Sequence, residues 1–442
     1  MKADTLTLLL ALSLFSAFAV AALSDGQRHL LYYRDENGDR GERVRVDPKM
    51  RFENPRLRNA YIALQAWKQA IVSDPLNFTA NWKGPNVCSY FGVFCAPAPD
   101  NHRIRTVAGV DLNHGDIAGY LPEELGLLTD LALLHLNSNR FCGSLPLKLR
   151  RLRLLFELDL SNNRFAGKFP AVVLQLPSLF FLDLRFNEFE GPVPSQLFDK
   201  RLDAIFLNDN RLRFDLPENF GNSPVSVIVL SNNRFEGCIP ASLPRMSNLN
   251  ELILMHNEFS SCLPPEFGRL SNLTVFDVSS NGLVGELPSS LSGLVNLEQF
   301  NVAHNMFSGA IPPSICQLPR LLNFSASDNF FTGEPPTCLN LPSFDDRDNC
   351  LPRRPAQKSE ATCAAFASRP AVNCNSFGCK GSSSLPSPPV PLPSPPMSSP
   401  PLPVPSTPPP AIPLSPPPSP PPPVMPPPPP PSPPPPVMPP PP

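Results

Sequence analysis

The feature that most constrains this chain is a regular internal repeat. In each copy a Leu-x-x-Asn segment is followed by a proline, and successive prolines are evenly spaced except for two steps that are one position shorter. A short period with this pattern is typical of leucine-rich repeats. One copy cannot bury its leucines alone, so neighbouring copies must stack and share a core. The ten prolines that mark the copies are Pro122, Pro146, Pro170, Pro194, Pro217, Pro240, Pro264, Pro288, Pro312 and Pro336.

Each copy also predicts its own local structure. A short alternation such as Leu158-Asp159-Leu160 predicts a strand whose alternate side chains point inward. An asparagine recurs where the chain leaves the strand, and a buried amide there can satisfy backbone groups of the turn. We therefore interpret these asparagines as structural: Asn139, Asn163, Asn187, Asn210, Asn233, Asn257, Asn281, Asn305 and Asn329. The predicted fold class is α/β, a leucine-rich-repeat solenoid of ten repeats with a parallel concave sheet and capped ends.

The 442 residues divide into five predicted segments. Residues 1–22 have a basic start and an apolar run that ends in small residues, which predicts a signal peptide. Residues 23–100 form an arm and an N-terminal cap with a helix from Tyr61 to Val72. Residues 101–337 hold the ten repeats, and residues 338–380 form a cysteine-rich cap or hinge without repeats. Residues 381–442 form a proline-rich tail.

The two ends of the chain bear on its location. The apolar run of residues 6–22 is at the lower limit of a membrane span, and no second run is long enough, so we expect export without a membrane span. From Leu385 to Pro442 more than half of the chain is proline and no residue is charged, which predicts a polyproline II rod. At about 3.1 Å per residue such a rod reaches roughly 180 Å. A stiff spacer and a ligand for a proline-binding domain are the alternatives.

Eleven cysteines in an exported chain indicate disulfides. Cys88 and Cys95 should close the N-terminal cap. Cys238 and Cys262 occupy equivalent positions of neighbouring repeats, where one strand spacing matches the Cα distance of a disulfide. Cys316 with Cys338 is less constrained because the two are offset by two positions, Cys374 with Cys379 is the least constrained pair, and Cys350 and Cys363 are unassigned. Cys142 has no matching cysteine, which leaves either a buried inert thiol or a bridge to a second copy of the chain.

Three Asn-x-Ser/Thr segments predict N-linked glycosylation of an exported chain. They begin at Asn77, Asn272 and Asn323.

The outward strand positions predict the ligand. Acidic residues dominate them although the whole chain carries a net charge of only −2. An acidic groove with an aromatic floor suits a cationic, partly apolar ligand, since charge steers the approach and aromatic burial holds the complex. A surface that is merely solvated is the alternative. The predicted contact residues are Glu157, Asp159, Asp183, Asp203, Glu251 and Asp277, with Phe180, Phe181 and Phe206.

Catalysis is not expected. His135, Asp159 and Asp183 fall in equivalent places of successive repeats, but stacking of strands about 4.8 Å apart creates such columns automatically. No activated nucleophile, metal-ligand set or phosphate loop accompanies them. The sequence therefore predicts no enzyme, no cofactor and no metal site, and the near-neutral charge gives no reason to expect nucleic acid.

The whole pattern resembles the leucine-rich repeat extensins of the plant cell wall. The resemblance rests on Phe52-Glu53-Asn54-Pro55-Arg56-Leu57, on Ala66-Trp67, on the ten repeats, on the cysteine-rich hinge and on a tail in which Ser419 and Ser432 each precede four prolines. It implies a secreted, extracellular wall protein whose tail is hydroxylated, glycosylated and associated with wall polysaccharides. It further implies that the repeats bind small basic, cysteine-rich peptide hormones of the rapid-alkalinisation type.

One departure from the family concerns the tail. The last tyrosine of the chain is Tyr120, so the oxidative tyrosine cross-links typical of extensins are unavailable in the tail. A soluble inhibitor of wall-degrading enzymes is the alternative function, and such a protein would not need the tail. Salt washing of walls separates the two, because a free inhibitor is extracted and a wall component is retained.

Overall fold

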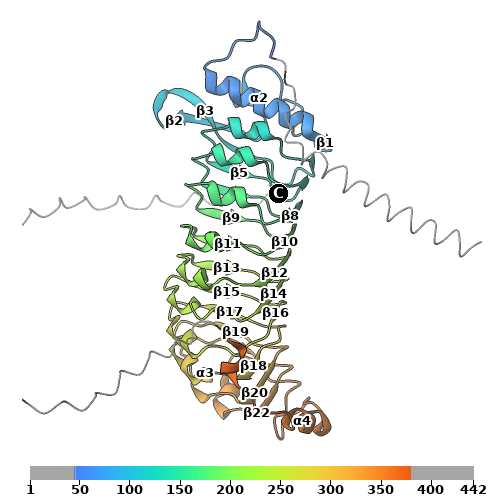
Figure 1. The fold of residues 1–442 in the computed structure, drawn as a ribbon, viewed down its shortest axis with the longest axis vertical. Helices are drawn as coiled ribbons and strands as arrows, with labels where there is room; N and C mark the ends of the chain where they lie inside the picture. Colours follow the sequence, from blue (N-terminus) through green and yellow to red (C-terminus); the bar gives the residue numbers. More distant parts are fainter. Residues whose placement is uncertain (1–43, 45, 380–442) are drawn as a thin grey trace, which may run out of the picture. The chain divides into compact units, whose positions relative to one another are not determined.

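The structure is a computed structural model that describes residue 44 and residues 46–379. The chain separates into units of residues 1–385 and 386–442, and the described residues all belong to the first. The predicted signal peptide and proline-rich tail lie outside the described residues. Figure 1 shows the repeats stacked as successive rungs, with short helices along one flank.

The repeats build one long sheet, here called the front sheet. Its twelve strands are joined in the order β2-β3-β5-β7-β9-β11-β13-β15-β17-β19-β21-β23, and all pairs after β2–β3 are parallel. Most of the strands are short, and the middle residue of each points into the core. The strands are β2 Val93–Ala98, β3 Asn101–Asp111, β5 Leu133–His135, β7 Glu157–Asp159, β9 Phe181–Asp183, β11 Ala204–Phe206, β13 Val227–Val229, β15 Glu251–Ile253, β17 Val275–Asp277, β19 Gln299–Asn301, β21 Asn323–Ser325 and β23 Ser343–Asp345.

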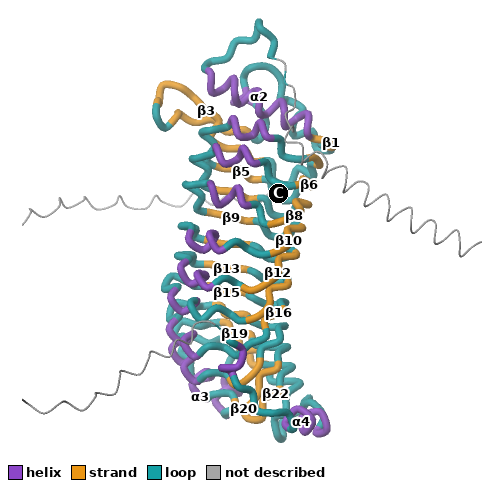
Figure 2. Tube along the Cα trace, viewed as in Figure 1, coloured by secondary structure: helices purple, strands orange, loops and turns teal. Residues whose placement is uncertain are grey.

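A second layer, here called the side sheet, follows the turn of each repeat (Figure 2). It comprises an eight-stranded part and a three-stranded part. Its strands are β1 Ile71–Ser73, β4 Ala118–Gly119, β6 Arg140–Gly143, β8 Arg164–Lys168, β10 Glu188–Gly191, β12 Arg211–Asp215, β14 Arg234–Gly237, β16 Glu258–Phe259, β18 Val284–Glu286, β20 Met306–Ala310 and β22 Phe330–Gly333. Buried phenylalanines of these strands stack between repeats, as Phe165 of β8 and Phe189 of β10 do at 6.4 Å.

Short helices complete the repeats. Most of them begin directly after a repeat proline that occupies the N-cap position, as Pro122 and Pro146 do. The 3₁₀ helices of the repeats are η2 Glu123–Leu127, η3 Leu147–Arg151, η4 Ala171–Gln175, η5 Ser195–Asp199, η6 Glu218–Asn222, η7 Leu243–Arg245, η8 Pro265–Arg269, η9 Ser289–Gly293 and η10 Pro336–Asn340, with the α-helix α3 Pro313–Cys316 in the same place. Outside the repeats lie η1 Val87–Ser89 and η11 Cys374–Phe377.

The predicted structural role of the asparagines is confirmed. In a typical copy, the side-chain carbonyl of Asn163 accepts the backbone N–H of Phe141, and its amide donates to the backbone oxygens of Leu136, Leu160 and Ser161. The residue before each asparagine has a positive φ, for example 53° at Asn162. The ladder also extends beyond its expected end, because Asn349 makes the same contacts next to β23, in the segment expected to lack repeats.

The predicted Cys238–Cys262 disulfide is wrong. Cys238 bonds to Cys379 and Cys262 bonds to Cys374. The prediction assumed that positions one full repeat apart face each other, which holds in the front sheet, where Glu157 pairs with Phe181. In the side sheet Glu236 pairs with Glu258, so the register there is shorter than the repeat and the two cysteines are out of step.

Of the other predicted cysteine pairs, two are confirmed and one is wrong. The Cys88–Cys95 and Cys316–Cys338 pairs are present, while Cys374–Cys379 is wrong because these two cysteines bond to Cys262 and Cys238. The structure adds Cys350–Cys363. Cys142 is the free cysteine of the described chain, and burial raises the pKa of its thiol, which favours the inert alternative.

The N-terminal cap is built on the helix α2, Pro55–Ala70. It begins before the predicted start at Tyr61, because the Asn54 side chain accepts the backbone N–H groups of Arg56 and Leu57 and Pro55 occupies the first turn. Trp67 and Trp82 are fully buried between this helix and the first repeats. Strand β1 then pairs antiparallel with β4 and fixes the cap to the side sheet.

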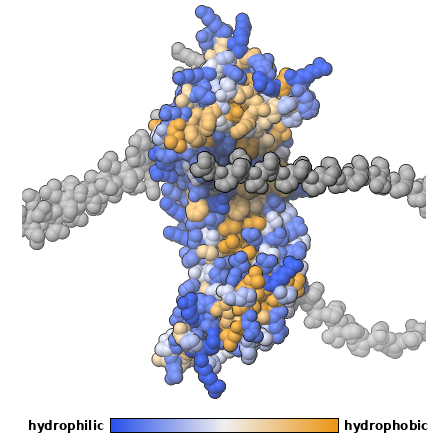
Figure 3. Space-filling model, turned by 180° about the vertical axis from the view of Figure 1, so that it is seen from behind, coloured by the Kyte–Doolittle hydropathy of each residue, from blue (hydrophilic) through white to orange (hydrophobic). Residues whose placement is uncertain are grey.

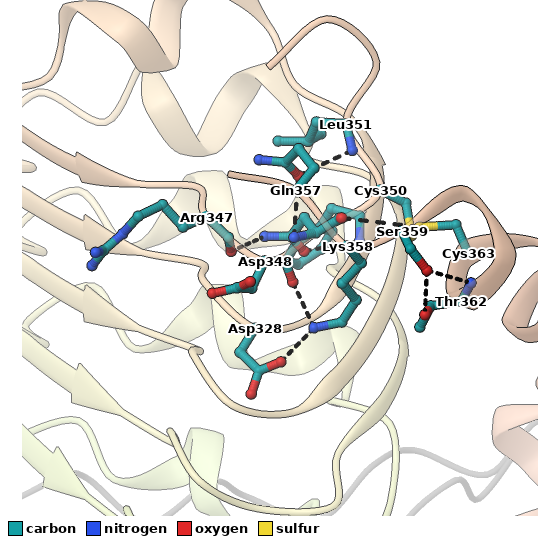
Figure 4. Close-up of a disulfide and its surroundings, with 12 residues drawn as sticks. Asp328, Arg347, Asp348, Cys350, Leu351, Gln357, Lys358, Ser359, Thr362 and Cys363 are labelled. Carbon is teal, nitrogen blue, oxygen red and sulfur yellow. Dashed lines mark hydrogen bonds and ion pairs between the residues drawn. A yellow bond between two sulfur atoms is a disulfide. The ribbon is translucent and has the colours of Figure 1, made fainter. Parts of the chain in front are cut away.

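The C-terminal cap ends in a segment that turns back. Lys358 contacts Asp328 and donates to the backbone oxygen of Asp348 at 2.7 Å, beside the Cys350–Cys363 disulfide (Figure 4). The helix α4, Glu360–Ala367, has no buried residue. After it, residues 368–379, here called the return segment, run back to the repeats of β16 and β14, where the two long-range disulfides hold them.

Glycine makes room for one of these disulfides. Gly285 in β18 has a φ of +83°, and a Cβ atom there would lie 2.9 Å from the sulfur of Cys262 and 3.4 Å from that of Cys374. A larger residue at this position would be strained and would displace the return segment.

Candidate functional site

The outward side chains of the front sheet form two rows, because each short strand directs its first and third positions away from the core. From β7 to β13 the first-position row reads Glu157, Phe181, Ala204 and Val227, and the third-position row reads Asp159, Asp183, Phe206 and Val229. Neighbours within a row stand about 4.8 Å apart. The surface is therefore a narrow strip of paired side chains whose character changes from repeat to repeat.

Three zones follow each other along this strip. The acidic zone consists of His135, Glu157 and Asp159. The apolar zone comes next and consists of Phe181, Ala204, Phe206, Val227, Val229, Ile253 and Val275, with two acids in the same rows, the buried Asp183 on β9 and the half-exposed Glu251 on β15. The polar zone at the far end consists of Asp277, Gln299, Asn301, Asn323, Ser325, Ser343 and Asp345. Figure 3 shows apolar surface gathered along the middle of the face opposite to that of Figure 1, with hydrophilic surface on both sides.

The acidic zone holds its carboxylates in place. The Glu157 carboxylate lies 3.1 Å from Nε2 of His135 on the neighbouring strand. Asp159 accepts hydrogen bonds from the backbone N–H and the hydroxyl of Ser161, at 2.9 and 2.6 Å. Both carboxylates stay half-exposed. They are therefore accessible to charge-assisted hydrogen bonds from an incoming cation.

Asp183 differs from the exposed acid that the sequence suggests. Its side chain is 1 % exposed, next to Phe206 on the following strand. Arg185 donates its backbone N–H to Asp183 at 3.0 Å, and its Nε also lies 3.0 Å from the carboxylate, although without hydrogen-bond geometry. Burial raises the pKa of Asp183 to about 7. The hydrogen bond from the backbone N–H of Arg185 lowers this pKa, and the charge of Asp159 raises it further.

The aromatic residues lie where they can contact a ligand. Phe206 has its ring centroid 5.9 Å from that of Phe181, and the guanidinium of Arg185 lies 5.2 Å above it. Phe180 stands just before β9 and stacks on Phe156 at 5.0 Å, and both are exposed. A hollow beside this stacked pair is also lined by Ser178, Asp199 and Arg201. The acidic zone thus borders directly on aromatic surface.

The predicted contact residues therefore fall into two groups. Seven lie together on or just before β7, β9 and β11: Glu157, Asp159, Phe180, Phe181, Asp183, Asp203 and Phe206. The other two, Glu251 on β15 and Asp277 on β17, are separated from them by β13, whose outward residues are both valine. Asp277 is already engaged, since it accepts hydrogen bonds from Ser279 and from the amide of Asn301.

Sequence reasoning missed the aliphatic part of the apolar zone. Val227, Val229, Ile253 and Val275 are ordinary strand residues, and a search for charge and aromatic rings passes over them. The available signal is their place in the alternation, which puts all four on the outward face of consecutive strands. Several adjacent outward aliphatic residues are uncommon on a surface that faces only water.

Two negative findings apply to the described residues. Residue 44 and residues 46–379 contain no group of three or more His, Cys, Asp or Glu side chains that could hold a metal ion. The helices in the same ranges fall short of the length and apolar character that a membrane span needs.

Comparisons with known proteins agree with this architecture. Residues 61–96 match the model of the leucine rich repeat N-terminal domain, and residues 272–294 and 296–318 match that of the leucine rich repeat. The chain is 75 % identical to leucine-rich repeat extensin-like protein 4 of Arabidopsis thaliana over 82 % of its own length and 74 % of the relative. It is 76 % identical to leucine-rich repeat extensin-like protein 3 of the same plant over 83 % of its length, but spans only 49 % of that relative.

Solved structures of receptor ectodomains share the fold. The Arabidopsis receptor kinase HAESA, in complex with the peptide hormone IDA and the co-receptor SERK1, is 30 % identical with a TM-score of 0.59, over 66 % of this chain and 50 % of HAESA. A TDR receptor is 32 % identical with a TM-score of 0.54, over 55 % of this chain and 44 % of the receptor. The chain belongs to the leucine-rich repeat extensin-like proteins.

Proposed function

We propose that this protein is an extracellular binding protein whose front sheet holds a small basic secreted peptide. The observation that carries the proposal is the contact between the acidic zone and the apolar zone at β7, β9 and β11. Cationic side chains of a peptide would meet Glu157 and Asp159, and its apolar side chains would cover Phe181 and Phe206. Attraction between opposite charges speeds association, and desolvated aromatic contacts slow dissociation.

The related receptor structure supports a peptide as the ligand class. HAESA binds the peptide hormone IDA, and its repeat fold is shared with this chain. The proposal that the peptide is basic and of the rapid-alkalinisation type rests on the charge of the acidic zone and on family resemblance. Peptide binding would place the protein in wall organisation and growth signalling, with no catalytic step.

The same proposal gives the tail a role. Residues 381–442 would associate with wall polysaccharides and retain the protein in the cell wall. Deletion of residues 385–442 should move the protein from the wall fraction into the soluble extracellular fluid. A truncated protein that stays equally insoluble would show that the tail is not the anchor, and complete extraction of the full chain by salt would favour the soluble inhibitor instead.

Binding can be tested directly. The full chain, secreted from plant cells, should capture basic cysteine-rich peptides from extracellular fluid, and calorimetry with a captured peptide should give a saturable isotherm. Charge-neutral variants of the same peptide, with arginine and lysine replaced by glutamine, serve as the control. Equal affinity for the charged and neutral peptides would contradict the role of the acidic zone.

A further inference from the structure

The polar zone carries a glycosylation sequence in an unusual place. Asn323-Phe324-Ser325 is strand β21 itself, in the front sheet. Its middle residue, Phe324, is buried and stacks on Phe300 at 5.2 Å, so Asn323 and Ser325 point outward. Such sequences mark N-linked glycans in exported proteins and are expected on surface loops. Here the sequence is on the front sheet, the surface proposed to hold the peptide.

The surroundings of Asn323 leave room for a large group. Its side chain is exposed, and its in-register neighbours, Gln299 on β19 and Ser343 on β23, are exposed as well. These strands line a hollow that also receives Asn301, Ser325 and Asp345. Short amide and hydroxyl groups of this kind can exchange hydrogen bonds with sugar hydroxyls.

The other two glycosylation sequences have different settings. The amide of Asn272 donates to the backbone oxygen of Ser247 at 2.8 Å, as the amides of Asn248 and Asn296 do to the equivalent oxygens of their own neighbours. Asn77 lies in a turn with a φ of 57°, where the hydroxyl of Thr79 is bound to Asp74. Both are exposed, but neither lies on the front sheet.

We infer that Asn323 carries an N-linked glycan that covers the polar zone and restricts the peptide to the acidic and apolar zones. In the reaction, Nδ2 of Asn323 forms a bond to the anomeric carbon of an oligosaccharide donated by a lipid pyrophosphate. The bond between that carbon and the pyrophosphate oxygen breaks, and the proton lost by the amide goes to the departing lipid pyrophosphate. The inference rests on export, which is part of the proposed function and which the five disulfides support.

Occupancy is tested by peptide mapping of the full chain secreted from plant cells. The peptide that contains Asn323 should be glycosylated, and enzymatic removal of the glycan should convert Asn323 to aspartate. Ser325→Ala should abolish the modification although Asn323 is unchanged, and Ser325→Thr should keep it. An unmodified Asn323 peptide from extracellular protein would overturn this inference alone, and a chain that never leaves the cell would overturn the proposed function as well.

Coverage of the polar zone needs a separate measurement. A lysine introduced by Ser343→Lys should react several-fold more slowly with a bulky amine reagent in the glycosylated protein than in the Asn323→Gln background. Val227→Lys, in the same row of the front sheet, is the matched control and should react equally in both. Equal labelling at position 343 in the two backgrounds would show that a glycan, even if attached, does not cover the zone.

Discussion

The two ends of the front sheet share one backbone plan and differ in surface chemistry. At β7 to β11 the outward residues are carboxylates next to phenylalanines, whereas at β19 to β23 they are mainly amides and hydroxyls. The backbone pairing is the same at both ends, with the regular register of the front sheet. The repeat therefore fixes the direction in which each side chain points, and the binding specificity depends on which residues occupy the outward positions.

The largest expected effect comes from reversing charge in the acidic zone. Glu157→Lys with Asp159→Lys should weaken binding of a basic peptide about 100-fold, close to 3 kcal/mol, because two favourable ion pairs become repulsive. Asp277→Lys in the polar zone should change affinity less than about threefold. Calorimetry on all three proteins checks this. Equal losses at both ends would mean that the peptide spans the whole strip.

The second effect concerns Asp183 and pH. The unfolded chain ionises this carboxyl above its ordinary pKa near 4, while burial keeps it protonated in the folded protein up to a pKa of about 7. Its contribution to stability is therefore complete below pH 4 and is lost as pH rises through 7. Between pH 5 and 8 the free energy of unfolding should fall by roughly 2.5 kcal/mol on this account.

Asp183→Asn should remove that part of the pH dependence. The control is Asp277→Asn in the polar zone. Denaturant titrations at pH 5 and 8 should show that this variant keeps the wild-type change of unfolding free energy with pH. Glu334 in the last repeat, just after β22, whose pKa burial also raises to about 7, is present in every variant, so the difference in slope isolates Asp183. An unchanged slope in Asp183→Asn would contradict the buried, protonated state.

A smaller effect is expected from the aromatic surface. Phe206→Ala should reduce peptide affinity about tenfold, because a half-buried ring that gains cover on binding contributes on the order of 1–2 kcal/mol. Asn301 lies in the same row as Phe206 but in the polar zone, and Asn301→Ala should reduce the peptide affinity by less than about twofold. Thermal melts of both variants should first establish that each retains the fold. A larger loss at Asn301 would place the peptide at the other end.

The smallest effect is that of salt. Raising ionic strength from low to several-fold physiological levels should weaken wild-type binding about threefold, since exposed charges are screened over about 10 Å or less. The variant with Glu157→Lys and Asp159→Lys should lose this weakening with salt, while Asp277→Lys should retain it. If Asp277→Lys, and not the double variant, lost the weakening with salt, the peptide would bind at the polar zone instead of the acidic zone.

Much of this arrangement could be predicted from the sequence, because repeats make position predictable. Asn163 and its counterparts fill the turn, and Phe181 and Phe206 point outward, as the alternation predicts. The burial of Asp183 could not be predicted, since it depends on Arg185 contacting both the carboxylate and the ring of Phe206. The Cys238 pairing failed because the side sheet has its own register and because the return segment has no periodicity to follow.

The return segment has a mechanical consequence. A pulling force applied to the chain beyond Cys379 enters the repeat body at Cys238, through a covalent bond. The Cys262–Cys374 disulfide is a second covalent link between the return segment and the repeats. Tension therefore bypasses α4, the C-terminal cap and the rungs β18, β20 and β22, which remain inside a covalently closed loop. The Cys350–Cys363 disulfide and the stacking of Phe366 on Phe330, which hold α4, are spared the load, and the load is transmitted instead to the rungs at the middle of the ladder, next to the apolar zone.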